Sequence, residues 1–166
     1  MRKIIFKDGT SLLIPDGIIS EMASYRQLHN RDEESGGILL GKKKIGIEAY
    51  ELSQISCPQG EDKRNKYEFL RSKNSHQHII TQAWKSSGGI VNYIGEWHTH
   101  AENIPYPSKI DLKLIEQIKQ DGSCCYSKIF MIIVGRNSLC VFAYTNLTPR
   151  KDYLIGGIYE NLYCDK

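Results

Sequence analysis

The most constraining feature of this sequence is the segment IVNYIGEWHTH at residues 90–100, an apolar run that ends in two histidines. Its apolar residues predict a buried strand. Because side chains alternate between the two faces of a strand, His98 and His100 point to the same side and can bind one metal ion together. A loop with two prolines follows, and Ser108 then begins a helical pattern. This unit therefore places two potential metal ligands beside the start of a helix.

Strand and helix patterns alternate along the rest of the chain. The predicted strands form hairpins over 2–14 and 36–57 and single strands at 67–70, 90–100, 128–135, 138–145 and 153–163. The predicted helices cover 16–29, 74–86 and 108–121, and residues 58–66 are expected to be a surface loop. We expect residues 1–166 to form a single domain of the α/β (α+β) class, with a mixed sheet flanked by helices.

Composition excludes several classes of protein. A net charge of +3 is too small for a dedicated nucleic-acid binder, although residues 42–44 form a local lysine cluster. No apolar run approaches the roughly 20 residues needed to span a membrane, and Lys7 and Asp8 interrupt any leader too early. We therefore expect a cytoplasmic protein. The odd number of cysteines, without a CxxC pair, indicates reduced thiols at Cys57, Cys124, Cys125, Cys140 and Cys164.

A catalytic metal site needs a third ligand, and Asp111 is the natural candidate because it lies in the first turn of the helix after the histidines. Taken alone, Ser108 and Asp111 would more often cap a helix than bind a metal. Each histidine alone would also be an ordinary polar residue at a strand end. A second HxH pair, His76 and His78, falls on a predicted helix, where residues two apart diverge, so we expect both to face solvent.

The whole pattern resembles the JAMM (JAB/MPN) family of metalloproteases. The family pattern is a glutamate upstream, then HxH, seven residues, and SxxD. Here ESGGILLG supplies Glu34, GEWHTH supplies the histidines, AENIPYP is the seven-residue spacer, and SKID completes the pattern. The resemblance covers about residues 15–145 and implies the curved mixed sheet flanked by helices of the JAMM/MPN fold, which is cytidine-deaminase-like.

The resemblance also implies a role for each residue. His98, His100 and Asp111 would bind Zn²⁺, Glu34 would act as general base on a water molecule, and Ser108 would stabilise the oxyanion. We expect the neighbouring Glu33 to point away from the site and Trp97 to lie in the core. Glu96 could hydrogen-bond to a ligand from behind, although a carboxylate that is on the surface or buried and paired is the simpler interpretation. Ala101 departs from the family, which often has proline after the second histidine, so the shape of the following loop is open.

Family members cleave isopeptide bonds to ubiquitin or act on ubiquitin-like tails. The compact chain resembles stand-alone bacterial JAB proteins, including those in antiphage (CBASS) operons. That implies a ubiquitin-like protein or conjugate tail as substrate, bound extended along a sheet edge. The implied partners are activating and conjugating enzymes or a nucleotide cyclase, with no nucleic acid and no membrane.

Two other functions stay open at the level of sequence. One is a non-catalytic MPN scaffold, which would usually lack some of the ligands. The other is a metal hydrolase with a DNA-related, RadC-like role, against which the small net charge argues. Arg64, Lys66, Arg71 and Lys73 could also meet an acidic partner, although a solvated loop is the simpler interpretation.

Overall fold

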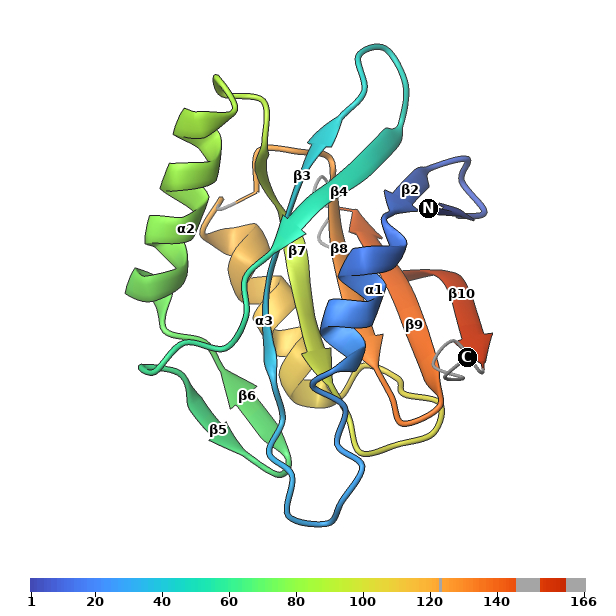
Figure 1. Ribbon diagram of the computed structural model, residues 1–166. Coiled ribbons are helices and arrows are strands. Elements are labelled where there is room, and N and C mark those ends of the chain that lie inside the picture. Colours follow the sequence, from blue (N-terminus) through green and yellow to red (C-terminus); the bar gives the residue numbers. More distant parts are fainter. Residues whose placement is uncertain (123, 146–152, 161–166) are drawn as a thin grey trace.

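A computed structural model describes residues 1–122, 124–145 and 153–160 (Figure 1), in which one large mixed sheet is flanked by helices. Its strands are β1 (Arg2–Ile5), β2 (Ser11–Ile14), β3 (Gly36–Lys43), β4 (Ala49–Ile55), β7 (Asn92–Thr99), β8 (Lys128–Val134), β9 (Ser138–Thr145) and β10 (Tyr153–Glu160). A small separate hairpin consists of β5 (Lys63–Asn65) and β6 (Glu68–Leu70). The helices are α1 (Asp16–Ala23), α2 (Lys73–Ser86) and α3 (Lys109–Gln120).

The large sheet has the strand order β1-β2-β4-β3-β7-β8-β9-β10. The β2–β4 and β7–β8 pairs are parallel and the other neighbours are antiparallel. The sheet curls so far that its two edges meet. A Cβ added to Gly156 of β10 would lie 2.6 Å from side-chain atoms of Ile4 and Phe6, at the edge formed by β1. The mixed, curved sheet with flanking helices confirms the fold class expected from the sequence.

Two hydrophobic cores cover the two faces of this sheet. Ile18, Ile19 and Met22 of α1 pack on one face, inside the curl. Ala83 of α2 and Ile115 and Ile118 of α3 pack on the other. Consecutive residues of the central strands alternate between the cores; β8, for example, directs every second side chain to each face. The apolar character of β8 on both faces follows from this double coverage.

A bulge in β7 sets the direction of the histidines. Leu40 pairs with Tyr93 and Leu39 pairs with Gly95, so Ile94 is an extra residue in β7. As a result Ile94 and Trp97, three residues apart, both face the α1 core, and His98 faces the other side, where α3 lies. Gly95 has φ 156°, and a Cβ there would lie 1.9 Å from the carbonyl oxygen of Phe130. Only glycine fits at this position.

Most predicted elements are present, but α1 ends at Ala23 and not near residue 29. Ser24 Oγ donates to the carbonyl oxygen of Glu21, and Arg26 Nε donates to that of Ala23, so side chains compete for the last helical carbonyls. The helical spacing of Ile18, Ile19, Met22, Tyr25 and Leu28 had predicted the longer helix, but Leu28 is half exposed. The helix prediction was therefore too long by about one and a half turns.

The predicted surface loop at 58–66 was also partly wrong, because residues 63–65 form β5 and pair with β6. The helical spacing of the apolar residues in α2 and α3 predicts that Trp84 and Ile110 point inward, but they are 49% and 46% exposed. Periodicity alone predicted too many buried positions, because α2 and α3 bury only part of the apolar face that their sequences present.

The prediction for His76 was wrong. It is fully buried, with Nδ1 2.8 Å from Ser56 Oγ and Nε2 3.1 Å from the Asp62 carboxylate. This buried hydrogen-bonded chain anchors α2 to the end of β4 and to the loop before β5. His78 is exposed, as predicted.

No helix in the described part of the chain is long and apolar enough to cross a membrane. Within the same residues Cys57, Cys124, Cys125 and Cys140 form no disulfide, and Cys124 and Cys140 are buried. Cys164 and residues 161–163 of the last predicted strand lie outside the described residues.

Candidate metal centre and active site

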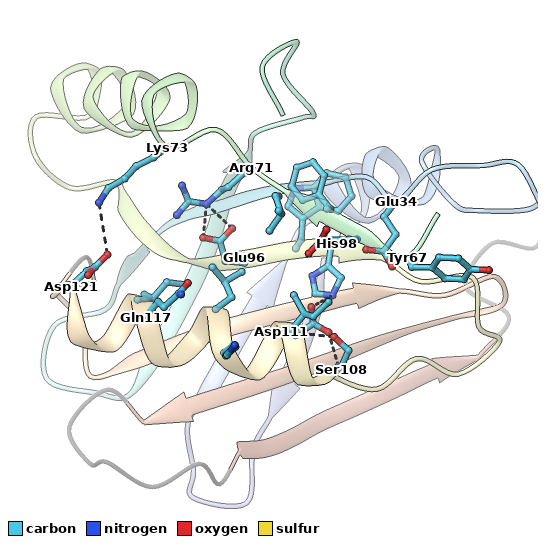
Figure 2. A pocket seen from close by; sticks show the side chains of 18 residues that line it. Glu34, Tyr67, Arg71, Lys73, Glu96, His98, Ser108, Asp111, Gln117 and Asp121 are labelled. Atoms are coloured by element: carbon cyan, nitrogen blue, oxygen red, sulfur yellow. Dashed lines mark hydrogen bonds and ion pairs between the residues drawn. The ribbon is translucent and has the colours of Figure 1, made fainter. Parts of the chain in front are cut away.

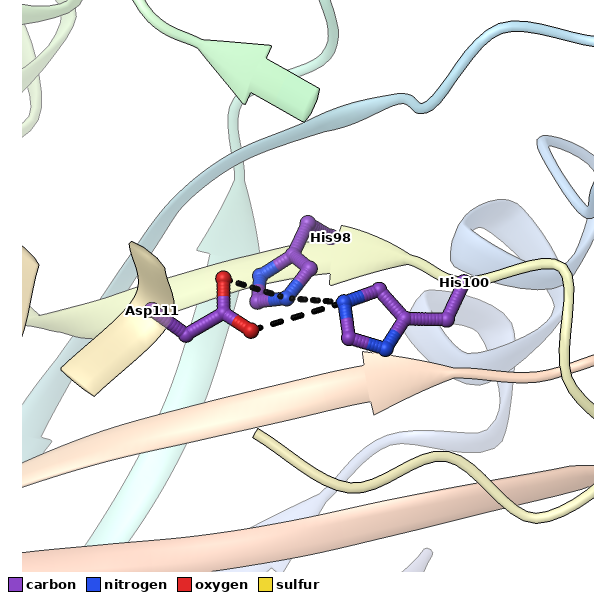
Figure 3. A group of neighbouring side chains, drawn as sticks. All are labelled: His98, His100 and Asp111. Carbon is purple, nitrogen blue, oxygen red and sulfur yellow. Dashed lines mark hydrogen bonds and ion pairs between the residues drawn. The ribbon is translucent and has the colours of Figure 1, made fainter. Parts of the chain in front are cut away.

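The side chains of His98, His100 and Asp111 converge on one point (Figure 3). The two imidazole Nε2 atoms lie 3.2 Å apart. Asp111 Oδ1 lies 3.2 Å from His98 Nε2, and Asp111 Oδ2 lies 3.5 Å from His100 Nε2. All three residues are buried. The structure therefore brings together the three residues that the sequence predicted as ligands.

These spacings fit a tetrahedral divalent metal ion. Ligand atoms about 2.0–2.1 Å from a tetrahedral metal lie about 3.3 Å from one another. Two imidazole nitrogens and one carboxylate also form a ligand set typical of catalytic sites that leave one position for water. The donor atoms and their spacing thus suit a metal without rearrangement.

Asp111 has two structural tasks at once. Ser108 is the N-cap of α3, its hydroxyl accepts the Asp111 N–H at 3.2 Å, and its own N–H donates to Asp111 Oδ2 at 2.6 Å. The capping box therefore uses Oδ2 and leaves Oδ1 facing His98. The two interpretations of SKID, helix cap and ligand, are compatible in one side chain.

Electrostatics within the cluster favour a cation. Burial opposes charge on His98, but the Asp111 carboxylate beside it holds the pKa of His98 above its ordinary value. Burial likewise opposes ionisation of Asp111, but His98, hydrogen bonds from both histidines and Ser108 hold its pKa far below the usual range. Asp111 is therefore an anion at any physiological pH, and a metal ion would compete with a proton at His98.

Glu34 reaches the cluster because β3 lies unusually close to β7. Gly36 pairs with His98, and a Cβ on Gly36 would lie 2.5 Å from the Trp97 carbonyl oxygen and 2.9 Å from His98 Cβ. Glycine at this position lets Glu34, two residues earlier, lie beside the ligands. The Glu34 backbone is also held by the β5–β6 hairpin: its N–H donates to Asn65 O at 2.8 Å, and its carbonyl oxygen accepts Arg64 Nε at 2.8 Å.

Glu34 is buried, with 7% of the residue exposed, and its pKa is shifted. Burial raises the pKa of Glu34 to about 7, the charge of His98 opposes the shift, and the negative charge of Asp111 adds to it. A carboxylate with a pKa near neutrality can both take and return a proton. The neighbouring Glu33 is exposed, as predicted.

A cavity of about 370 Å³ extends from the cluster between β6 and α3. Figure 2 shows Glu34, His98, Ser108 and Asp111 at one end, and the Lys73–Asp121 ion pair at the other. One wall is formed by Tyr67, in the turn before β6, and by Phe69 and Leu70 of β6; the opposite wall is α3 with Ile110, Leu114 and Gln117. The exposed Ile110 thus faces this groove.

Sequence reasoning missed the groups that support the site. Arg64 and Arg71 were considered as partner-facing or solvated, but Arg64 bonds to Glu34 O and Ser35 Oγ, and Arg71 Nε donates to the buried Glu96 at 2.9 Å. Glu96 also accepts the Tyr93 hydroxyl at 2.7 Å, so of the alternatives left open for it the structure shows a buried, paired carboxylate, and Trp97 is in the core as expected. The arginine partners had no local signal, because they are contacts between distant segments.

Comparison with known proteins gives consistent relatives. The chain is 32% identical to a protein from Escherichia coli over 85% of this chain and 88% of that protein. It is 35% identical to one from Vibrio cholerae over 81% and 83%, and 32% identical to one from Pseudomonas aeruginosa over 74% and 73%. All three relatives are named CD-NTase/cGAS isopeptidase.

A solved structure and a family comparison agree with this. The solution structure of protein DSY2949 from Desulfitobacterium hafniense superposes with a TM-score of 0.54 at 14% identity, covering 81% of this chain and 84% of that one, which shows a shared fold. Residues 17–146 match the family described as prokaryotic homologs of the JAB domain. This match includes Glu34, both histidines of the HxH segment and α3 with Asp111 in its first turn. The chain therefore belongs to the prokaryotic JAB family.

Proposed function

We propose that this chain is a zinc-dependent isopeptidase. It would hydrolyse the bond between the C-terminal tail of a ubiquitin-like or similar conjugated protein and its target, in a bacterial conjugation or antiphage defence system. The observation that carries the proposal is the convergence of His98, His100 and Asp111 beside Glu34 at the end of a groove, in a chain whose relatives are named CD-NTase/cGAS isopeptidase.

His98 and His100 would hold the zinc ion through Nε2, and Asp111 through Oδ1. When bound, zinc supplies Lewis-acid chemistry, which polarises the scissile carbonyl and lowers the pKa of water towards about 7. Glu34 accepts the proton of the attacking water and returns it to the leaving amine as the C–N bond breaks. The Ser108 hydroxyl, at the same end of the groove, donates to the developing oxyanion. The products are a carboxylate tail and a free amine.

The groove would hold the substrate tail. Within the described residues β6 pairs only with β5, so its other edge, along the cavity, has backbone groups available for an added strand. Apolar side chains of Phe69 on β6 and Ile110 and Leu114 on α3 would contact alternate tail residues. The far end at Lys73 and Asp121 sets the length of tail that the groove can cover.

The relatives' names support a proposal about the partners. We propose a nucleotide cyclase as a conjugated protein, with its activating and conjugating enzymes, and a cytoplasmic location for the reaction. A scaffold that only binds partners would have no need of three converging ligands and a carboxylate of raised pKa. A DNA-related hydrolase is disfavoured by the net charge of +3.

The test combines metal content with cleavage. Elemental analysis should find one zinc per chain in the wild type and none in His100→Ala or Asp111→Ala. The substrate is the C-terminal tail of the cognate cyclase fused to a reporter protein. Glu34→Gln should keep the zinc and lose about 10²–10⁴-fold in kcat.

Glu33→Gln is the matched control, because Glu33 is the adjacent carboxylate and is exposed; it should retain activity. A wild type that binds no metal would leave the scaffold as the better explanation. A zinc-loaded wild type whose cleavage is unaffected by Glu34→Gln would contradict the assignment of the base.

A further inference from the structure

Gln27 is a fully buried polar side chain outside every helix and strand. A buried amide is costly unless its groups are hydrogen-bonded. Gln27 Nε2 donates to the carbonyl oxygens of Asp32 at 3.1 Å and Lys66 at 3.0 Å, and Oε1 accepts the Thr99 hydroxyl at 3.4 Å. Because both N–H groups meet carbonyls, the orientation of the amide is fixed: its oxygen must face Thr99.

Thr99 is the residue between the two ligand histidines, and its side chain points to the opposite face of β7. Its N–H donates to Ser35 O at 2.8 Å, and its hydroxyl oxygen accepts the Ser35 N–H at 3.0 Å. The hydroxyl proton is then left for Gln27 Oε1. These bonds join the HxH segment to the residue that directly follows Glu34.

The three segments that meet at Gln27 each supply one part of the site. Asp32 lies just before Glu34, Lys66 is in the turn of the β5–β6 hairpin that walls the groove, and Thr99 lies between the ligands. The Gln27 backbone is itself fixed, since its carbonyl oxygen accepts Arg136 Nε at 3.0 Å. One side chain is therefore hydrogen-bonded to the segment before Glu34, to the hairpin that walls the groove and to the HxH segment.

We propose that Gln27, acting through Thr99 and the backbone before Glu34, is a positioning residue that holds the Glu34 carboxylate in register with the metal ligands. The inference rests on the proposed function for its effect on catalysis. Gln27 touches neither substrate nor ligands, and it lies in a segment that the helical periodicity assigned to α1. Its effect should appear in the rate of the chemical step, because small displacements of a base cost much rate.

The first experiment measures steady-state kinetics of zinc-loaded Gln27→Met, which keeps the volume of the side chain and removes its hydrogen bonds. We expect kcat to fall about ten-fold or more, KM to stay within about two-fold, and zinc content to stay at one per chain. Thr99→Val should behave alike, and Thr99→Ser, which keeps the hydroxyl, should restore kcat. Gln77→Met, on the exposed face of α2, is the matched control and should leave kcat unchanged.

The second experiment measures amide hydrogen exchange on the same proteins and needs no activity. In Gln27→Met the amides of Glu34, Ser35 and Thr99 should exchange about ten-fold faster or more, with Ile132 in the centre of β8 unchanged. Equal acceleration at Ile132 would show that Gln27 supports only global stability, and unchanged exchange with unchanged kcat would also overturn the proposal. If the wild type cleaves no substrate, the proposed function fails, and the exchange pattern still decides whether Gln27 holds Glu34.

Discussion

At the scale of single residues, Ser108 combines two roles that substitutions can separate. Its hydroxyl caps α3 by accepting the Asp111 N–H, and the same hydroxyl lies at the reactive end of the groove. Capping needs an acceptor or a permissive backbone, whereas oxyanion stabilisation needs a donor. The two roles should therefore respond differently to alanine and to glycine.

We predict that Ser108→Ala lowers the free energy of unfolding by about 1 kcal/mol, whereas Ser108→Gly lowers it by only a few tenths. Both should lose a similar factor in kcat, about 10²-fold, because neither has a hydroxyl to donate. Urea unfolding and steady-state cleavage measure the two effects. If Ser108→Gly instead kept much more activity than Ser108→Ala, in proportion to its higher stability, Ser108 would act only as a helix cap.

The convergence of the three candidate ligands was predictable from sequence, but the contacts that support their segments were not. His98, His100 and Asp111 are encoded by strand alternation and by position in a helical first turn, both of which are local. Gln27 and Arg64 act through contacts with residues far along the chain, at Thr99 and Glu34. No local pattern marks which glutamine is buried or which arginine bonds to a distant segment, so these contacts emerge only in three dimensions.

At the scale of elements, the bulge in β7 decides which face the histidines occupy. A strand without the extra residue would direct His98 towards the α1 core and Trp97 towards α3. The sequence predicted β7 as a strand but not this bulge, although Gly95 inside an apolar run was its one visible sign. The same limit explains the overlong α1, where side-chain bonds to helical carbonyls outweighed periodicity.

Gly95→Ala should therefore be severely destabilising. Its Cβ would lie 1.9 Å from the backbone oxygen of Phe130, at φ 156°, and we expect a loss of about 3 kcal/mol or more in urea unfolding. Gly46→Ala is the control: φ is 79°, nothing lies within 4 Å of the new Cβ, and the cost should be about 1–2 kcal/mol. Equal costs would show that the contact with Phe130 does not constrain the bulge.

At the scale of the whole molecule, the two cores are joined by shared strands. Ile132 of β8 belongs to one core and Ile133, its neighbour, to the other, so neither core can open alone without disturbing the same strand. We propose on this basis that residues 1–166 fold as one cooperative domain.

The metal-free protein should accordingly unfold in a single transition, coincident by far-UV circular dichroism and tryptophan fluorescence. Zinc at about one hundred times its Kd should raise Tm by about 5–10 °C, and Asp111→Ala should abolish this shift. Calorimetry in chelator and in zinc measures both. Two separate transitions in chelator would argue for two folding units.

The site is assembled from separate stretches of chain: the candidate ligands lie within residues 98–111, and Glu34 lies on the segment that leads into the neighbouring strand β3. Loss of the carboxylate therefore leaves the ligand cluster and the groove walls untouched. Glu34→Gln should therefore give a protein that still binds conjugates but does not cleave them. Because a glutamate codon becomes a glutamine codon by one nucleotide change, a protein that only binds conjugates could evolve from this one by a single mutation.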